Sequence, residues 1–229
     1  ATHPGGVLLD PFFSTGTINV STMTLAGGTD GADTITAALT VAQWITGGAG
    51  DDSIAASNMN DLIVGGSGHD YLRGLIGADV LIGGAGDDIL DGGDNGLFVD
   101  GIDALGNGTG GTAKGDTLVG GDGFDVTSYM TVTGTVGVAV YLAANGVNSG
   151  WALNDVFIDV EGLSGSVNAD TLVGDDGDNE LRGNQGNDSL SGGLGNDTYV
   201  FGRGDGLDTV VDSFAALTET LVSATGQLS

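Results

Sequence analysis

The sequence contains no cysteine, only 2 prolines, and only 4 lysines and arginines against 31 acidic residues. Without cysteine the chain can form no disulfides or zinc–thiolate sites and can carry out no thiol catalysis. No apolar run approaches the ~20 residues that a membrane-spanning helix requires. The formal net charge of −27 argues against nucleic acid or an anionic membrane as a partner and favours a cation.

Motifs for catalysis are scarce as well. There are only 2 histidines and no His-Glu-x-x-His zinc-protease motif. His69 stands near Ser67 and Asp70, but adjacency within a turn does not produce the geometry of a catalytic triad. Pairs of adjacent aspartates are explained by sequence repetition without glycosidase chemistry. We therefore expect no enzymatic activity.

What the sequence does contain is a glycine-rich nonapeptide, Gly-Gly-x-Gly-x-Asp-x-U-x, in which U is a large apolar residue. Full copies begin at Gly47, Gly65, Gly83 and Gly192. Aligning the less regular copies gives further repeats, and all starts together are residues 28, 38, 47, 56, 65, 74, 83, 111, 120, 165, 174, 183 and 192. A fixed period of this kind predicts repeated units that stack on one another. High acidity could also indicate disorder, but 40% of the residues are apolar and they keep a fixed phase.

Two columns of this alignment agree on the phase. The sixth position is acidic in most repeats, with Gln43 and Asn179 as the exceptions; the acidic members are Asp33, Asp52, Asp61, Asp70, Asp79, Asp88, Asp116, Asp125, Asp170, Asp188 and Asp197. The eighth position is apolar in every repeat except the one with Thr127. Glycine at positions 1 and 4 indicates a tight turn with positive φ. The x-U-x part predicts a strand of about three residues whose middle side chain points inward.

One apolar residue per strand is a thin core. Each buried aliphatic side chain contributes ~1.5–3 kcal/mol, whereas ordering the backbone costs about 1–2 kcal/mol for every residue. Another interaction must stabilise the stack, and the aspartate column is the candidate. Calcium suits such loops because it accepts six to eight oxygens from carboxylates and backbone carbonyls in flexible geometry, whereas magnesium requires a stricter octahedron.

These repeats resemble the RTX (repeats-in-toxin, haemolysin-type) family of calcium-binding β-roll proteins. The resemblance implies an all-β, right-handed parallel β-roll in which two nonapeptides make one coil and several Ca²⁺ ions lie between successive loops. Asp52, Asp70 and Asp88 would then line one edge, and Asp61 with Asp79 the other. In the last block, Asp170 would pair with Asp188 and Asn179 with Asp197. The implied ligands are the aspartates above, Asn179, and the carbonyls of Gly48, Gly50, Gly66, Gly68, Gly77, Gly84, Gly86, Gly177, Gly186, Gly193 and Gly195.

Some repeats depart from the pattern. Position 4 is not glycine at Val41, Met59, Lys114 and Asn168, and Gln43 and Asn179 lack the aspartate charge. We expect sites that use these loops to be weak or empty.

Five segments are expected along the chain. They are an N-terminal flanking segment (1–27), a first β-roll block (28–96), a glycine-rich insert with one repeat pair and longer bridging strands (97–164), a second block (165–201), and a C-terminal cap or start of a secretion signal (202–229). The alternation of Val136, Val138, Val140 and Leu142 predicts one of the bridging strands, within a wider coil on the same axis. Spacing of Phe214, Leu217, Leu221 and Val222 predicts a short capping helix.

Three functions fit these features. The first is a non-enzymatic, calcium-responsive module of a secreted bacterial protein that folds outside the cell. The second is a structural or adhesive segment of a surface layer or adhesin. The third is an accessory module of a secreted polysaccharide-modifying enzyme or lipase. Because the sequence begins at Ala1 and not Met, we expect it to be part of a larger parent protein.

Overall fold

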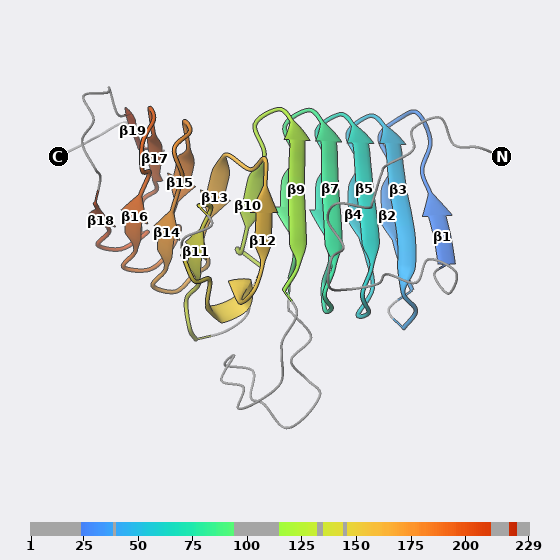
Figure 1. The fold of residues 1–229 in the computed structure, drawn as a ribbon, viewed down its shortest axis with the longest axis horizontal. Coiled ribbons are helices and arrows are strands. Elements are labelled where there is room, and N and C mark those ends of the chain that lie inside the picture. Colours follow the sequence, from blue (N-terminus) through green and yellow to red (C-terminus); the bar gives the residue numbers. More distant parts are fainter. Residues whose placement is uncertain are drawn as a thin grey trace.

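The computed structural model describes residues 24–38, 40–93, 115–131, 135–143, 146–211 and 220–223. These residues form strands β1 to β19 and one short 3₁₀ helix, η2 (Gly150–Ala152), and the paired strands all run parallel (Figure 1). The predicted all-β, parallel roll is therefore confirmed. Within the described part of the chain, no helix is long and apolar enough to cross a membrane.

Three sheets build the roll, and we name them the N-terminal, long and C-terminal sheets. The N-terminal sheet contains β1 (Thr24–Gly27), β3 (Gln43–Ala49), β5 (Leu62–Ser67), β7 (Val80–Ala85), β9 (Thr117–Asp122) and β12 (Val156–Ile158). The long sheet contains β2 (Thr34–Thr36), β4 (Ser53–Ala55), β6 (Tyr71–Arg73), β8 (Ile89–Asp91), β10 (Val126–Ser128), β13 (Gly162–Ser164), β15 (Glu180–Arg182), β17 (Thr198–Phe201) and β19 (Thr220–Ser223). The C-terminal sheet contains β11 (Ala139–Tyr141), β14 (Thr171–Val173), β16 (Ser189–Ser191) and β18 (Thr209–Val210).

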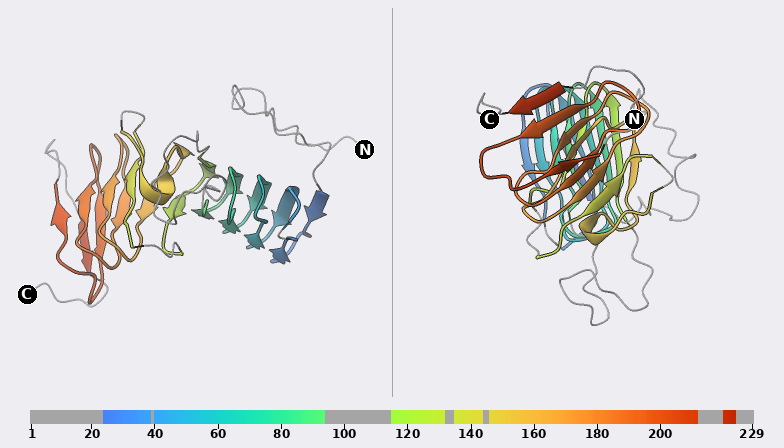
Figure 2. Two further views of the ribbon diagram at one scale, coloured as in Figure 1. Left: turned by 90° about the horizontal axis from the view of Figure 1, so that it is seen from below. Right: turned by 90° about the vertical axis from the view of Figure 1, so that its left-hand side faces the viewer.

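An ordinary coil contains two nonapeptides, one strand in each of two opposed sheets. Leu62 pairs with Val80 in the N-terminal sheet, and Ser53 pairs with Tyr71 in the long sheet. Both pairs are two repeats apart, as expected. The end view in Figure 2 shows the orange C-terminal strands slanted against the blue and green N-terminal strands.

The core between the sheets is one side chain wide and is built from position 8. In the N-terminal half it contains Ile45, Ile54, Ile63, Leu72, Leu81, Leu90 and Leu118. In the C-terminal half, Leu172, Leu181, Leu190 and Tyr199 occupy the same position and are fully buried. The alternation of Cβ directions along a strand explains why only the middle residue of each x-U-x segment points inward. Thr127 is buried in the same column.

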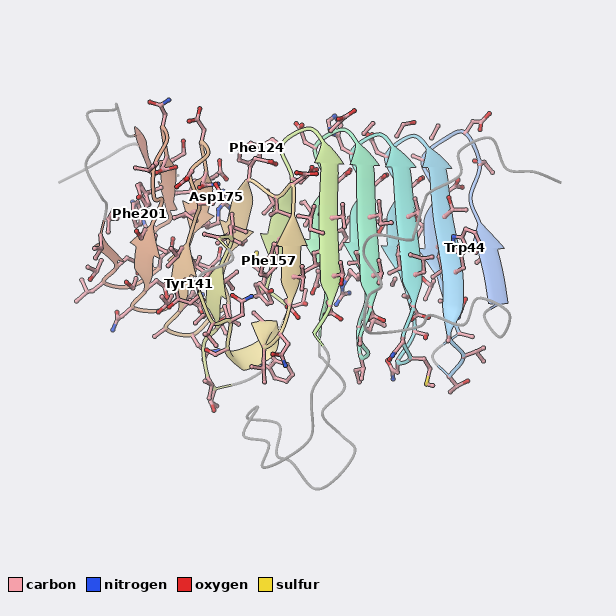
Figure 3. The ribbon with its side chains drawn as sticks, in the orientation of Figure 1. Trp44, Phe124, Tyr141, Phe157, Asp175 and Phe201 are labelled. Atoms are coloured by element: carbon pink, nitrogen blue, oxygen red, sulfur yellow. The ribbon has the colours of Figure 1, made fainter. Side chains whose placement is uncertain are left out.

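The two halves meet in one coil that is twice the ordinary length. Val126 of β10 pairs with Gly162 of β13, 162 − 126 = 36 residues later, where an ordinary coil takes 18. The extra chain forms β11, which starts the C-terminal sheet, and η2, before β12 returns to close the N-terminal sheet. Phe157, labelled in Figure 3, packs against both cores. The expected wider coil is thus present, and Val138 and Val140 are buried in it. The prediction of longer bridging strands is wrong, because β11 and β12 have three residues each and Val136 is exposed.

The register around residues 92–116 differs from the repeat alignment. We expected a repeat to begin at residue 111, but the carboxylate of Asp116 lies against Gly92 in the way that each repeat aspartate lies against its own first glycine. Thr117 pairs with Val80, 117 − 80 = 37 residues earlier. Residues 92, 93, 115 and 116 therefore belong to a single loop, and the intervening residues are an insertion within that loop.

The C-terminal helix was predicted over a segment that is only partly described. Residues 220–223 form strand β19, which pairs with β17. The prediction is therefore wrong for Leu221 and Val222, whose backbone continues the long sheet. Phe214 and Leu217 lie outside the described residues.

Candidate metal centre

The sixth-position side chains form two rows, one along each edge of the roll. Loops that enter the long sheet make the first edge, which contains Asp33, Asp52, Asp70, Asp88, Asp125, Asn179 and Asp197. Loops that leave it make the second edge, which contains Gln43, Asp61, Asp79, Asp116, Asp170 and Asp188. The edges follow from the order of strands in the three sheets. The predicted neighbours along each edge are thereby confirmed.

A ladder of hydrogen bonds connects each row. The backbone N–H of Asp52 donates to Oδ1 of Asp70 at 2.8 Å, and the N–H of Asp70 donates to Oδ1 of Asp88 at 2.7 Å. On the second edge, the N–H of Asp61 donates to Oδ1 of Asp79 at 2.8 Å. The same contact joins Asp170 to Asp188 and Asn179 to Asp197. One carboxylate oxygen per loop therefore holds neighbouring coils together.

The other oxygen of most of these carboxylates is buried and has no hydrogen-bond partner among the described residues. Asp70 and Asp88 are only 2% and 1% exposed, yet their Oδ2 atoms contact no donor in the described part of the chain. The full set of such Oδ2 atoms belongs to Asp52, Asp70, Asp79, Asp88, Asp116, Asp125 and Asp188. A buried, ionised carboxylate oxygen without a donor is costly, so these positions favour a bound cation or a proton.

Glycine at position 1 makes room for this oxygen. A Cβ on Gly65 would lie 2.2 Å from Oδ2 of Asp70, and one on Gly83 would lie 2.3 Å from Oδ2 of Asp88. Neither glycine has a positive φ. The expected reason for glycine at this position, a left-handed turn, is therefore wrong, and the reason is the space that the carboxylate occupies.

Glycines at positions 2 and 4 do adopt the left-handed conformation in the regular loops. Gly66 and Gly68 have φ values of 130° and 131°. Their carbonyl oxygens face the next loop: a Cβ on Gly84 would lie 2.1 Å from the oxygen of Gly66, and one on Gly86 would lie 2.0 Å from that of Gly68. The carbonyls of Gly48, Gly50 and Gly177 face the next loop in the same way, opposite Gly66, Gly68 and Gly195.

The donor set is all oxygen. Within the described ranges, nowhere do three or more His, Asp or Glu side chains cluster as a metal site, so backbone carbonyls must complete any coordination shell. Calcium accepts this mixture of carboxylates and carbonyls, and the buried Oδ2 atoms fit it. When bound, the ion would supply the positive charge that these carboxylates otherwise lack.

Four of the predicted ligand side chains are placed differently. Oδ2 of Asp33, Asp61 and Asp170, and Oδ1 of Asn179, each accept a hydrogen bond from the backbone N–H at position 2 of their own loop, at 2.6–2.9 Å. These oxygens already have donors.

The alignment of the repeats missed three acidic residues that extend the rows of sixth-position side chains. Oε2 of Glu161 accepts the N–H of Asp125 at 2.9 Å, Oδ1 of Asp155 accepts that of Asp116 at 2.8 Å, and Oδ1 of Asp208 accepts that of Asp188 at 3.1 Å. None of the three lies in an aligned nonapeptide. Their shared signal is an acidic residue directly before a short strand.

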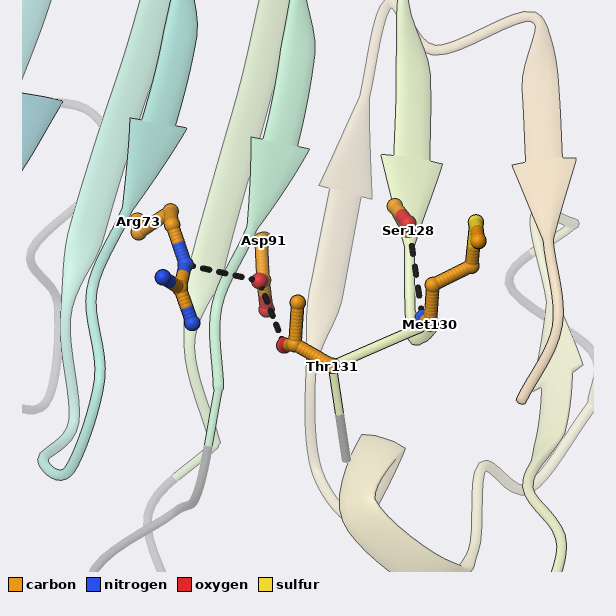
Figure 4. A network of polar contacts seen from close by, with 5 residues as sticks. All are labelled: Arg73, Asp91, Ser128, Met130 and Thr131. Atoms are coloured by element: carbon orange, nitrogen blue, oxygen red, sulfur yellow. Dashed lines mark hydrogen bonds and ion pairs between the residues drawn. The ribbon is translucent and has the colours of Figure 1, made fainter. Parts of the chain in front are cut away.

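Asp91 is another buried carboxylate, but it has a cationic partner. Arg73 Nε lies 3.2 Å from Asp91 Oδ2, and the Thr131 hydroxyl donates to the same oxygen at 2.6 Å (Figure 4). The side chain of Asp91 is 2% exposed. This ion pair connects adjacent strands of the long sheet, β6 and β8, and joins the ninth positions of two repeats, outside the sixth-position rows.

Burial raises the pKa of several row carboxylates. Loss of solvation raises the pKa of Asp88 and Asp125 to about 6 and that of Asp188 to about 7, and nearby carboxylates add to the rise in each case. Burial likewise raises the pKa of Asp79 and Asp116 well above the ordinary value. Without a cation, the folded roll therefore holds protons that the unfolded chain releases.

We expect acid to stabilise the metal-free roll. The folded pKa values of about 6 to 7 exceed the unfolded value of about 4, so stability falls as the pH rises from about 4 to about 7. In calcium the pH dependence of stability reverses, because protons compete with the ion for the same carboxylates. Thermal unfolding followed by circular dichroism at pH 4.5, 6 and 8, in chelator and in calcium, measures both trends. A metal-free midpoint that rises with pH would contradict this assignment.

Comparison with known families agrees with the geometry. A family model described as "RTX calcium-binding nonapeptide repeat (4 copies)" matches residues 42–72, 64–95 and 164–199. These ranges contain most of the regular loops of both halves. A search of curated proteins found no match to the chain. These two ranges of the chain, 42–95 and 164–199, therefore contain RTX calcium-binding nonapeptide repeats.

Proposed function

We propose that this chain is a non-enzymatic module that folds when it binds calcium. The observation that carries the proposal is the set of seven buried Oδ2 atoms, in rows along the roll edges, that have no donor among the residues that the structure describes. Each lies beside a glycine on which a Cβ would come within 2.1–2.5 Å of it. The loops are thus shaped around a charged oxygen that the protein itself does not neutralise.

Calcium adds stability through mass action. One occupied site contributes RT ln(1 + [Ca]/Kd), or about 1.4 kcal/mol at ten times Kd. Extracellular modules bind calcium with Kd values on the order of 10⁻⁴ M or weaker, so several sites together stabilise the roll at millimolar calcium. At low calcium the aspartates repel one another and keep the chain expanded.

This difference suits a secreted protein. RTX repeats are typical of secreted proteins, and we propose that this chain leaves a bacterial cell by the one-step export route in an expanded state. Calcium outside the cell then folds it. The rest of a larger parent protein would carry any further activity.

We expect calcium to reduce the radius of gyration of the chain, which should remain monomeric. An unfolded chain of this length has a radius of gyration of about 50 Å, whereas a compact one measures about 17 Å and an elongated roll somewhat more. Small-angle scattering in chelator and in millimolar calcium measures the change. An unchanged radius would reject the proposal. Calcium-dependent assembly into larger species would instead favour the structural or adhesive role.

A further inference from the structure

The loops at the roll edges have two distinct conformations, distinguished by the residue at position 2. In one conformation this residue has a positive φ, as at Gly48, Gly66, Gly84, Gly93 and Gly121. Leu75 (φ 77°) and Asn184 (φ 66°) share it. We call these loops open. Gly193 (φ 108°), in the loop of Asp197, has the same conformation. The sixth-position aspartates of the other open loops are the seven whose Oδ2 has no donor in the described residues, and Asp197 is not one of them.

In the other conformation, position 2 is Thr29, Ser57, Ser166 or Asp175, and none of these residues has a positive φ. We call these loops closed. Their position-2 N–H donates to the sixth-position side chain, and the hydroxyls of Thr29, Ser57 and Ser166 donate to the same carboxylate. The loop thus supplies the donors that an open loop lacks.

A second contact completes the closed loop. The position-4 N–H donates to the side chain at position 2, from Met59 to Ser57 at 3.2 Å, from Asn168 to Ser166 at 3.0 Å, and from Gly177 to Asp175 at 2.8 Å. In open loops this N–H points along the roll, and that of Gly68 donates to the carbonyl of Ala85 at 2.8 Å. Serine, threonine or aspartate at position 2 therefore stabilises the closed form.

Position 4 does not distinguish the two forms. Gly31 and Gly177 provide glycine at position 4 in closed loops, while Met59 and Asn168 occupy it in others. Leu75 provides the strongest contrast, because a leucine rarely adopts a left-handed conformation. Its loop stays open despite this strain, and strain of this kind persists where a functional interaction compensates for it.

We propose that the residue at position 2 determines whether a loop binds calcium. This inference rests on the proposed function. Open loops offer a bare carboxylate oxygen to the ion, and closed loops satisfy that oxygen internally and take none. The closed loops also lie where rows of open loops begin or end. Thr29 precedes the row from Asp52 to Asp125, Ser57 precedes Asp79 and Asp116, and Ser166 precedes Asp188. Each row of ions therefore begins beside a rung that needs no metal.

The sharpest test compares two substitutions at one site, Leu75→Ser and Leu75→Gly. Both remove the leucine side chain and its strain, but only serine can close the loop onto Asp79. We expect Leu75→Ser to bind one calcium ion fewer than the wild type, and Leu75→Gly to bind the same number. Native mass spectrometry in calcium gives the count, and equilibrium dialysis checks it.

The reverse change opens a closed loop in the other half of the roll. Ser166→Gly removes the hydroxyl and permits a positive φ, so we expect one additional ion. Ser67→Gly is the matched control, because Ser67 is an exposed position-3 serine, and its count should not change. If Leu75→Ser does not fold in calcium, Ser166→Gly decides alone.

The outcomes separate this inference from the proposed function. A wild-type chain that binds no calcium would reject the proposed function. A wild-type chain that binds several ions, with equal counts for both Leu75 variants or no gain in Ser166→Gly, would overturn the role of position 2 and leave the proposed function standing.

Discussion

In excess chelator at neutral pH, the chain is expected to give the circular dichroism spectrum of a coil, and millimolar calcium is expected to convert it to β-structure. The core is a single column of side chains, and seven buried carboxylate oxygens have no donor in the described residues. Burying even one unpaired carboxylate is strongly unfavourable, so the apolar column cannot hold the coils together by itself. Calcium removes this cost and restores folding.

Magnesium at the same concentration is the control for this experiment. It prefers strict octahedral geometry and retains its waters, so we expect it to leave the spectrum largely unchanged. Identical spectra in chelator and in calcium would refute the dependence on metal.

Asp88→Asn is expected to move the stability of the two forms in opposite directions. The amide retains Oδ1, which accepts the N–H of Asp70, but replaces the bare oxygen with an uncharged NH₂ group. With calcium at ten times Kd, the loss of one ion lowers stability by about 1.4 kcal/mol, or about tenfold in the folding equilibrium. Without calcium at neutral pH, removal of a buried charge stabilises the roll.

Asp122→Asn is the matched control. Asp122 is an exposed acid in the adjacent loop, so the same change of charge should shift the calcium midpoint only slightly. Denaturant unfolding in calcium measures the stability of the bound form of both variants. Circular dichroism in chelator at neutral pH, where the wild type is expected to be a coil, measures how much β-structure each metal-free variant retains. A loss of stability in both conditions for Asp88→Asn would indicate a packing defect and would contradict the assignment of Asp88 as a ligand.

The repeating part of the fold was predictable because two independent sequence columns share one phase. Inward side chains such as Leu81 and ladder residues such as Asp70 follow from that phase alone, and the resemblance supplied the two-repeat coil. The same alignment placed a repeat at residue 111, since it could not show that Gly92 and Asp116 close one loop. An insertion inside a loop conserves the spatial period and breaks the sequence period.

Whether each loop is open or closed was harder to predict from the sequence. Weak sites were expected from position 4, where Met59 and Asn168 replace glycine, and both do lie in closed loops. The loop that contains Asp33 has glycine at position 4 and is closed as well. The distinction depends on which N–H reaches the carboxylate, a contact that appears only once the backbone is placed.

The long sheet crosses the seam between the two halves without interruption, from β2 to β19, whereas the sheet opposite it changes at β11 and β12 (Figure 1). In a stacked array, each rung gains most of its stability from its immediate neighbours. Unfolding of the coils on one side of the seam removes a hydrogen-bonded partner from β10 or from β13. It also exposes the surface of Phe157 that packs against the core on that side. The seam thus couples the two stacks through the long sheet, so that a coil held in place on one side of it stabilises the first coil on the other side.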